Sequence, residues 1–241
     1  SRNDLLYGIM GLVLLLWSPY SGMLHDEFYF DTFVIPWVLA SLLFLREKKA
    51  IHLFVSLIIV VGFKHYFAFF AALVCFLYYD ENRSKKAVWA GCFFIFYFLF
   101  IIFVAMPYLF NTETYVQEYI GGRKTDGFFN WAAYLLERAF NWESLIYLIN
   151  FFGIFLFIPL ISWRFTLLAF PILGINCIWF SSGILYSGPH YHILPNTILS
   201  VVFVMGCVGL NERIKSWCSQ FVKFITLLVT MIVICYYGYT P

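Results

Sequence analysis

The chain has 241 residues, of which 63% are hydrophobic and 12% are charged, and its mean hydropathy is +0.84. A soluble domain carries about 25% charged residues, so this composition excludes a soluble globular protein and indicates a polytopic membrane protein. The net charge of +2 gives no support to nucleic-acid binding. The six cysteines lie in or beside apolar runs without paired spacing, which indicates neither a disulfide framework nor a zinc site.

Apolar runs bounded by charged residues predict an all-α transmembrane bundle of about nine spans, which we treat as one domain over residues 1–241. The runs are 5–20, 28–45, 51–63, 66–79, 87–106, 143–162, 166–185, 193–210 and 220–237. A full crossing takes about 20 residues, so 51–63 and 66–79 are short. These two runs predict two spans, a re-entrant pair, or one long helix kinked at Lys64-His65. The chain begins with Ser-Arg-Asn-Asp and shows no cleavable signal pattern, so we expect a processed chain, a fragment or part of a longer protein.

The distribution of lysine and arginine orients the predicted spans. Connections rich in basic residues alternate with connections poor in them, and the rich ones, with the two ends, hold 11 of the 15 basic residues. These are Arg2, Arg46, Lys48, Lys49, Arg83, Lys85, Lys86, Arg164, Arg213, Lys215 and Lys223. The positive-inside rule places this side in the cytoplasm. We therefore expect a multi-pass protein of the cell or inner membrane whose acidic loops are extracytoplasmic.

Residues 24–31 place three carboxylates and a histidine between the first two predicted spans, with no lysine or arginine nearby. Carboxylates in this position cost solvation energy unless they meet water, a cation or a polar substrate. Asp26, Glu27 and Asp31 are therefore candidate catalytic acids on the outer face. Asp26 and Glu27 are also candidate ligands for a divalent cation, which prefers carboxylate oxygens.

The one long connection between predicted spans covers residues 107–142, on the outer side. Within it, 121–127 has the composition of a turn, and 128–140 has the pattern of an amphipathic helix with Glu137 and Arg138 toward water. Such a helix can roof a membrane-embedded site, although simple surface packing is the commoner role.

Further polar residues converge on the outer face and are candidates for substrate binding. They are Lys64, His65, Arg123, Lys124, His190, Tyr191 and His192. Lysine and arginine supply counter-charge for phosphate, a carboxylate takes the proton of an acceptor hydroxyl, and histidine serves either role. Each cluster alone is more often a solvated loop, and two histidines separated by one residue are weak support for a metal site. Together these residues suit transfer chemistry on a lipid-phosphate substrate.

Several short motifs follow one another in a characteristic order. They are Phe28-Tyr29-Phe30-Asp31 with Pro36, Lys64-His65, Met106-Pro107-Tyr108, Phe170-Pro171, and His190-Tyr191 with Pro195. From residue 28 to about residue 210, their order and spacing resemble a large family of bacterial and archaeal polytopic membrane proteins. That family is related to the GT-C glycosyltransferases, multispan enzymes that use polyprenyl-phosphate sugars. The resemblance implies a GT-C-like bundle, a polyprenyl-phosphate-sugar donor, and Asp31 as the acid that matches the family motif.

The chain departs from the family pattern at three points. Tyr29 and Phe30 stand where the family has His-Pro, and His65-Tyr66 stands where it has Glu-Asp after the lysine. Family members also carry additional N-terminal spans and an earlier outer loop. A second register instead aligns Asp26-Glu27 with the acid pair that GT-C enzymes often carry in the first outer loop. Span lengths favour the first register, and both registers put the acids on the side of the lipid donor.

Three functions are weighed on these grounds. The leading hypothesis is a GT-C-like membrane glycosyltransferase that uses a polyprenyl-phosphate sugar at the extracytoplasmic face. The alternative is a non-enzymatic membrane subunit or scaffold that binds lipids and partner membrane subunits, which the divergence at Tyr29, Phe30 and His65 favours. A transporter ranks last, because most charges lie at span ends and only Gly174 and Asn176 are modest candidates within a span.

Overall fold

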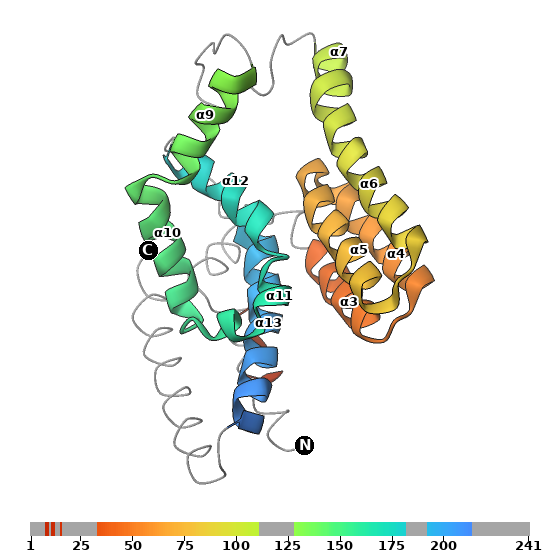
Figure 1. The fold of residues 1–241 in the computed structure, drawn as a ribbon, viewed down its shortest axis with the longest axis vertical. Coiled ribbons are helices and arrows are strands. Elements are labelled where there is room, and N and C mark those ends of the chain that lie inside the picture. The colour runs from red at the N-terminus through yellow and green to blue at the C-terminus, as the bar shows by residue number, and fades with distance from the viewer. Residues whose placement is uncertain are drawn as a thin grey trace.

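The computed structural model describes residues 8, 9, 11, 12, 15, 33–110, 128–181 and 192–213. This part of the chain is helical and contains no β-strand, which confirms the all-α class for it. The helices form two groups that lie side by side (Figure 1). The first group holds α3 (Val34–Arg46), α4 (Ala50–Phe63), η2 (His65–Phe67), α5 (Ala68–Asn82), α6 (Lys85–Phe100), η3 (Ile101–Ala105) and α7 (Met106–Phe110). The second holds α9 (Phe128–Ala139), α10 (Trp142–Ile154), η4 (Ile158–Ser162), α11 (Trp163–Thr166), α12 (Phe170–Ser181) and α13 (Ile193–Arg213).

The two short apolar runs form a helical hairpin. Helix α4 ends at Phe63 because the backbone of Lys64 is extended, at φ −149° and ψ 132°, and the short 3-10 helix η2 then leads into α5. Near the other end of α5, the hydroxyl of Tyr78 donates to the carbonyl of Lys48, just before α4, at 3.2 Å. Because the far end of α5 meets the start of α4, one long kinked helix is excluded.

Helix α6 is the most exposed apolar helix in the first group. Together with the π-helix η3 it runs from Lys85 to Ala105 without a break. Only 17% of the residues in its most apolar 18-residue stretch are buried. It packs along α5 on one side, and its outward side exposes large side chains that include Trp89, Phe93 and Phe96. An apolar surface of this size is unfavourable in water and suits a lipid environment.

The predicted span 143–162 is not one straight helix. Helix α10 and the segment Ile158–Thr166 meet at an angle of 91°. At the break, Leu156 and Phe157 adopt left-handed backbone conformations, with φ of 53° and 55°. Pro159 follows at the start of η4, where its missing N–H and its ring prevent α10 from continuing. The sequence pattern predicted this apolar run but not the bend within it.

Helix lengths support membrane association but leave the number of spans open. Within the described residues, Lys85–Ala105 and Ile193–Leu210 are long and apolar enough to cross a membrane, and the bent pair gives a third if it counts as one span. Helices α3 and α4 are apolar but shorter. The predicted run 220–237 and most of 5–20 lie outside the described residues. The expected bundle of nine spans is therefore not confirmed.

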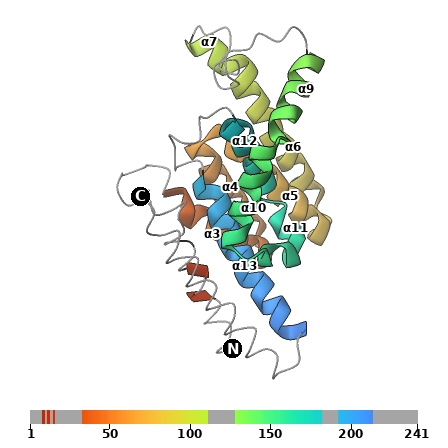
Figure 2. The same cartoon turned by 90° about the vertical axis from the view of Figure 1, so that its left-hand side faces the viewer.

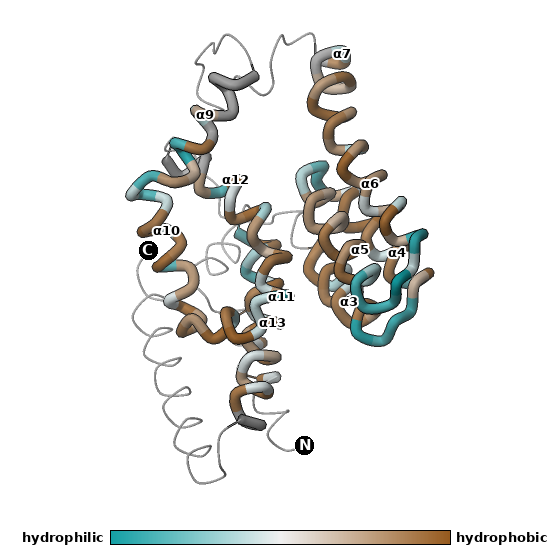
Figure 3. The backbone as a smooth tube through the Cα atoms, viewed as in Figure 1, coloured by the Kyte–Doolittle hydropathy of each residue, from teal (hydrophilic) through white to brown (hydrophobic). Residues whose placement is uncertain are grey.

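Polar connections gather at one end of the first group, where α3 joins α4 and α5 joins α6 (Figure 3). Asp80 near the end of α5 pairs with Arg164 of α11, which ties the second group to this end. Asp80 also lies 3.9 Å from Arg83. The sequence predicts that these connections and Arg164 share a face. The Asp80 pairs join α11 to the α5–α6 connection, and the hydrogen bond from Tyr78 to Lys48 fastens the α3–α4 connection to α5.

Candidate functional site

Three polar side chains from three helical segments meet in the interior of the second group. We call Tyr147, Asn176 and His192 the Tyr147 cluster; they are 3%, 0% and 7% exposed. The Nδ2 group of Asn176 on α12 donates to the hydroxyl oxygen of Tyr147 on α10 at 3.2 Å. That oxygen lies 3.1 Å from Nδ1 of His192, the residue before α13. Tyr147 is thus the link between α12 and the start of α13.

The Tyr147 hydroxyl makes two hydrogen bonds in the Tyr147 cluster. Its oxygen accepts from the amide of Asn176. Its bond with Nδ1 of His192 takes its direction from the tautomer of the imidazole, because Nδ1 accepts when Nε2 carries the proton and donates when it carries the proton itself. One hydroxyl group therefore bonds to both other members of the cluster.

Aromatic rings enclose the histidine of the cluster. The ring of Phe151 stacks on that of His192 with 6.0 Å between centroids, and the Tyr147 ring lies 5.8 Å away. These contacts come from successive turns of α10, so a single helix face both holds the imidazole and bonds it. Hydrogen-bonding groups set among aromatic surfaces are the usual lining of a small-molecule site.

The turn between α9 and α10 is fixed beside the Tyr147 cluster. Ser144, one turn before Tyr147, is fully buried, and its hydroxyl lies 2.9 Å from the carbonyl of Arg138 and 3.2 Å from that of Cys177. Asn141 caps α10 by accepting from the Ser144 amide at 2.7 Å. Helix α9 also packs against α12, and it lies beyond the end of α10 in both views (Figures 1 and 2). The helix predicted over 128–140 therefore exists and adjoins the cluster.

Other buried polar residues on α13 have structural partners. Thr197 and Ser200 bond to carbonyls of their own helix, at Ile193 and Asn196, over 2.7 Å and 2.8 Å. The side chain of Asn196 lies 3.4 Å from the carbonyl of Leu15, in the first predicted span. These bonds position α13 and do not form a second site.

Lys64 and His65 lie at the turn between α4 and α5, with contacts different from those of His192. The Nζ atom of Lys64 is 5.7 Å from the ring centroid of Tyr66, and the His65 ring stacks on Phe98 at 6.1 Å. Burial, and after it the positive charge of Lys64, lowers the pKa of the His65 imidazole. His65 is accordingly neutral at pH 7, which leaves Lys64 as the cation of this turn.

Most of the predicted site lies in parts of the chain that the structure does not describe. These residues are Asp26, Glu27, Asp31, Arg123, Lys124, His190 and Tyr191. Among the residues that are described, no group of three or more His, Cys, Asp or Glu side chains is arranged to hold a metal ion. The described contacts of Lys64 and His65 and those of His192 form two separate groups.

Tyr147 is the residue that sequence reasoning missed. It is one of 17 tyrosines, and nothing in its local pattern separates it from the others. Asn176 did stand out as a polar residue inside a predicted span, and the structure gives it a partner in Tyr147. Comparisons with known protein families, with curated proteins and with solved structures found no match to this chain.

Replacing Tyr147 with phenylalanine keeps the ring and removes the hydroxyl that Asn176 and His192 share. We expect a loss of about 0.5–1.5 kcal/mol in the free energy of unfolding, because a buried neutral hydrogen bond contributes on this scale. Detergent-unfolding curves followed by circular dichroism measure the change. Tyr97→Phe is the matched control, because the Tyr97 hydroxyl makes no hydrogen bond within the described part. Equal losses of stability for Tyr147→Phe and Tyr97→Phe would contradict the claim that the Tyr147 hydroxyl links α12 to the start of α13.

Proposed function

We propose that this chain is a multi-pass membrane protein of about nine spans with a GT-C-like architecture. In this proposal it transfers a sugar from a polyprenyl-phosphate donor to an acceptor at the extracytoplasmic face. Asp26 or Glu27 acts as the general base or as the ligand of a divalent cation, with Asp31 in support. Lys64, Arg123 and Lys124 face the donor phosphate.

The observation that carries the proposal is the Tyr147 cluster next to helix α9. A sugar presents hydroxyl groups that both donate and accept, and phenol, amide and imidazole groups are complementary to them. The cluster sets these three groups among aromatic side chains, in the first half of α10 and next to the turn from α9. In the proposal, His190, Tyr191 and His192 shape the sugar pocket and α9 covers it.

The placement of charge along the helices supports the proposed topology. At one end, Asp80 pairs with Arg164 of α11 and Arg83 of the α5–α6 connection, and Tyr78 of α5 donates to the carbonyl of Lys48 in the α3–α4 connection. The α4–α5 turn with Lys64 lies at the other end of the same hairpin. Under the positive-inside rule the first end is cytoplasmic, which puts Lys64 on the outer side with the acids.

A second candidate, the non-enzymatic membrane subunit, is favoured by the bare surface of α6. Its exposed aromatic side chains fit a partner helix as well as they fit lipid. Purification in detergent distinguishes the subunit from the enzyme. A subunit of an assembly should stay folded only when its partners are present, whereas the proposed enzyme should be folded and monodisperse alone.

Photocrosslinking tests where the donor binds. The full chain in detergent is incubated with a polyprenyl-phosphate sugar that carries a photoreactive group on the sugar. We expect crosslinks in the peptides that contain Tyr147 and His190–His192, and a decrease of fivefold or more on His192→Phe, which removes a hydrogen-bonding group while keeping a ring.

Lys86→Gln serves as the control for the crosslinking, because it removes one charge at the opposite end of the hairpin. It should leave the crosslink yield unchanged. Crosslinks confined to the exposed face of α6, with no dependence on His192, would contradict the proposed donor site.

A further inference from the structure

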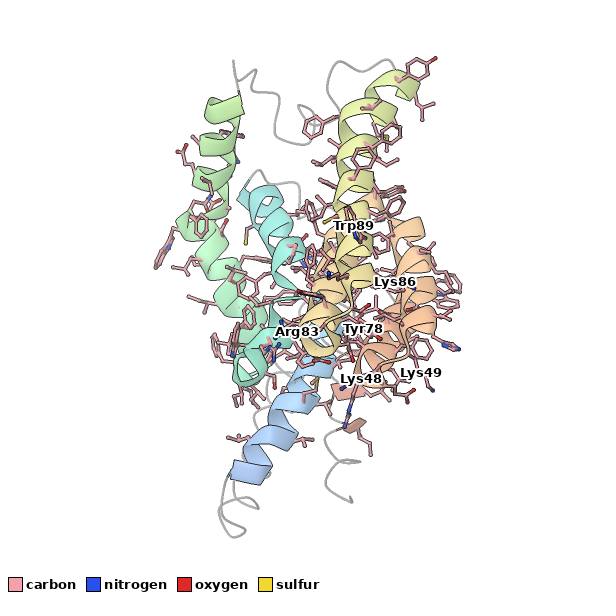
Figure 4. The ribbon with its side chains drawn as sticks, turned by 45° about the vertical axis from the view of Figure 1, so that its right-hand side comes forward. Lys48, Lys49, Tyr78, Arg83, Lys86 and Trp89 are labelled. Atoms are coloured by element: carbon pink, nitrogen blue, oxygen red, sulfur yellow. The ribbon has the colours of Figure 1, made fainter. Side chains whose placement is uncertain are left out.

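The end of the fold opposite the proposed donor site carries a second set of residues that the proposed transfer reaction does not use. We define the basic end as Lys48, Arg83, Lys85, Lys86 and Trp89, which lie on or beside the α3–α4 and α5–α6 connections. Figure 4 shows Lys48 and Lys49 of the α3–α4 connection gathered at this end with Arg83 and Lys86 of the α5–α6 region, and Tyr78 between them. All four cations are exposed.

Carboxylates neutralise only part of this charge. Glu47 pairs with Lys49 at 2.7 Å, and Asp80 is shared by Arg164 and Arg83. Lys48, Lys85 and Lys86 make no ion pair within the described residues. The basic end therefore keeps a local excess of positive charge that attracts anions from outside these helices.

The backbone holds the cations in place at some conformational cost. Lys48 and Arg83 both adopt left-handed conformations, with φ of 59° and 53°, where glycine is the usual residue. Tyr78, 7% exposed, donates its hydroxyl to the Lys48 carbonyl at 3.2 Å and so fastens the α3–α4 turn to α5. Lysine and arginine thus occupy two turn positions at which glycine would be less strained, and both carry their charge on the same end of the fold.

An exposed tryptophan lies one helical turn from the charges. Trp89 is 76% exposed on α6 and follows Lys85 and Lys86 by four and three residues, which places it on the same side of the helix. At a rise of about 1.5 Å per residue, the indole lies roughly 5 Å along the axis from the ammonium groups. Tryptophan beside lysine at the end of a long apolar helix is typical of the boundary between headgroups and acyl chains.

From these observations we infer that the basic end is a binding surface for the phosphate groups of anionic phospholipids. Lys48 and Lys86 contact lipid phosphates, Arg83 extends the surface, and Trp89 anchors α6 at the level of the headgroups. Basic clusters directly beside an apolar helix attract anionic lipids, and the attraction falls with salt. The inference is independent of any reaction at the opposite end.

Reconstituted full-length protein tests the inference. The chain is placed in nanodiscs of phosphatidylcholine alone or with phosphatidylglycerol, and lipid retention is measured by native mass spectrometry alongside the melting temperature. We expect phosphatidylglycerol to be retained preferentially and to raise the melting temperature. Raising the salt concentration from about 50 mM to about 500 mM should weaken both effects, because salt screens the attraction between exposed charges.

Two variants separate specific contacts from net charge. The double variant Lys48→Asn/Lys86→Gln removes two unpaired cations, and asparagine tolerates the left-handed backbone at position 48. We expect retention of phosphatidylglycerol to weaken by about 25-fold, or about fivefold for each lysine. The control Lys49→Gln/Arg138→Gln also removes two positive charges. Lys49 already pairs with Glu47, and Arg138 lies on α9, away from the basic end. This control should weaken retention by less than about threefold.

Three results would overturn the inference. The first is equal loss of lipid in the double variant and its control, which would mean that only net charge matters. The second is equal retention of phosphatidylcholine and phosphatidylglycerol by the unmodified chain. The third is equal protection by inorganic phosphate at the same phosphate concentration in detergent, which would make the basic end a general anion site and not a lipid surface.

Discussion

Replacing Gly206 with alanine is expected to lower the free energy of unfolding by about 1–3 kcal/mol, the range for overpacking a tight contact. A Cβ atom at position 206 would lie 2.7 Å from the carbonyl oxygen of Ile158 and 2.8 Å from its Cγ2 atom. The nearest atom belongs to backbone, so a change of rotamer cannot relieve the clash. Helix α13 and η4 would have to move apart.

The Gly206 contact matters because it holds the bent segment against α13. After the 91° break, η4 packs along α13, and the lack of a side chain at Gly206 lets the two backbones approach closely. Small residues have this role in many membrane helix pairs. Separation of α13 from η4 would also shift α13 relative to α10, and so disturb the Tyr147 cluster.

Gly209 provides the control on the same helix. No atom lies within 4 Å of a Cβ built at Gly209, so Gly209→Ala should be neutral or stabilising by up to about 1 kcal/mol, the usual gain for glycine to alanine within a helix. Thermal and detergent unfolding of the three proteins measure the difference. Equal changes in stability for Gly206→Ala and Gly209→Ala would contradict the close approach of α13 and η4 at Gly206.

Composition and the spacing of apolar runs were sufficient to predict the helical class and most helix positions. The predicted run 51–63 agrees with α4, and 193–210 lies within α13 (Ile193–Arg213), because charged or extended residues interrupt the apolar pattern where these helices begin or end. The amphipathic helix over 128–140 agrees with α9. Each of these features depends on local sequence, which the pattern records directly.

The bend and the Tyr147 cluster could not be predicted in the same way. The 91° break arises from left-handed residues at Leu156 and Phe157 ahead of Pro159, within a run that is uniformly apolar. The cluster joins residues 147, 176 and 192, which are brought together only when three helices pack. The sequence did select His192 as a site residue, but it gave no reason to pair it with Tyr147.

Replacing Asp26, Glu27 and Asp31 together with alanine is expected to reduce sugar transfer by 100-fold or more. Loss of a general base alone costs about 10²–10⁴ in rate, and loss of a cation ligand would add to it. In the proposal these carboxylates receive the proton of the acceptor hydroxyl, and segment 24–31 holds no other carboxylate that could replace them. Their removal should leave the described helices folded.

Single substitutions distinguish the two alignments of the acidic segment. If Asp31 is the acid that matches the family motif, Asp31→Ala alone should give most of the loss. If Asp26-Glu27 is the catalytic pair, one of those two substitutions should give it instead. Glu113→Ala/Glu118→Ala is the matched control, because it removes carboxylates from the predicted outer connection 107–142 that have no proposed role.

The most direct test of the account is a transfer assay with the purified, reconstituted chain, a radiolabelled polyprenyl-phosphate sugar, and membrane extract as the source of acceptor. We predict that label moves from the donor to an acceptor with the unmodified chain and with Glu113→Ala/Glu118→Ala. The Asp26/Glu27/Asp31 variant, folded to the same extent by circular dichroism, should give less than about 1% of that transfer, in line with the loss of a general base. Unchanged transfer by this variant would contradict the proposed role of the acidic segment, and absence of transfer by the unmodified chain would contradict the proposed enzyme.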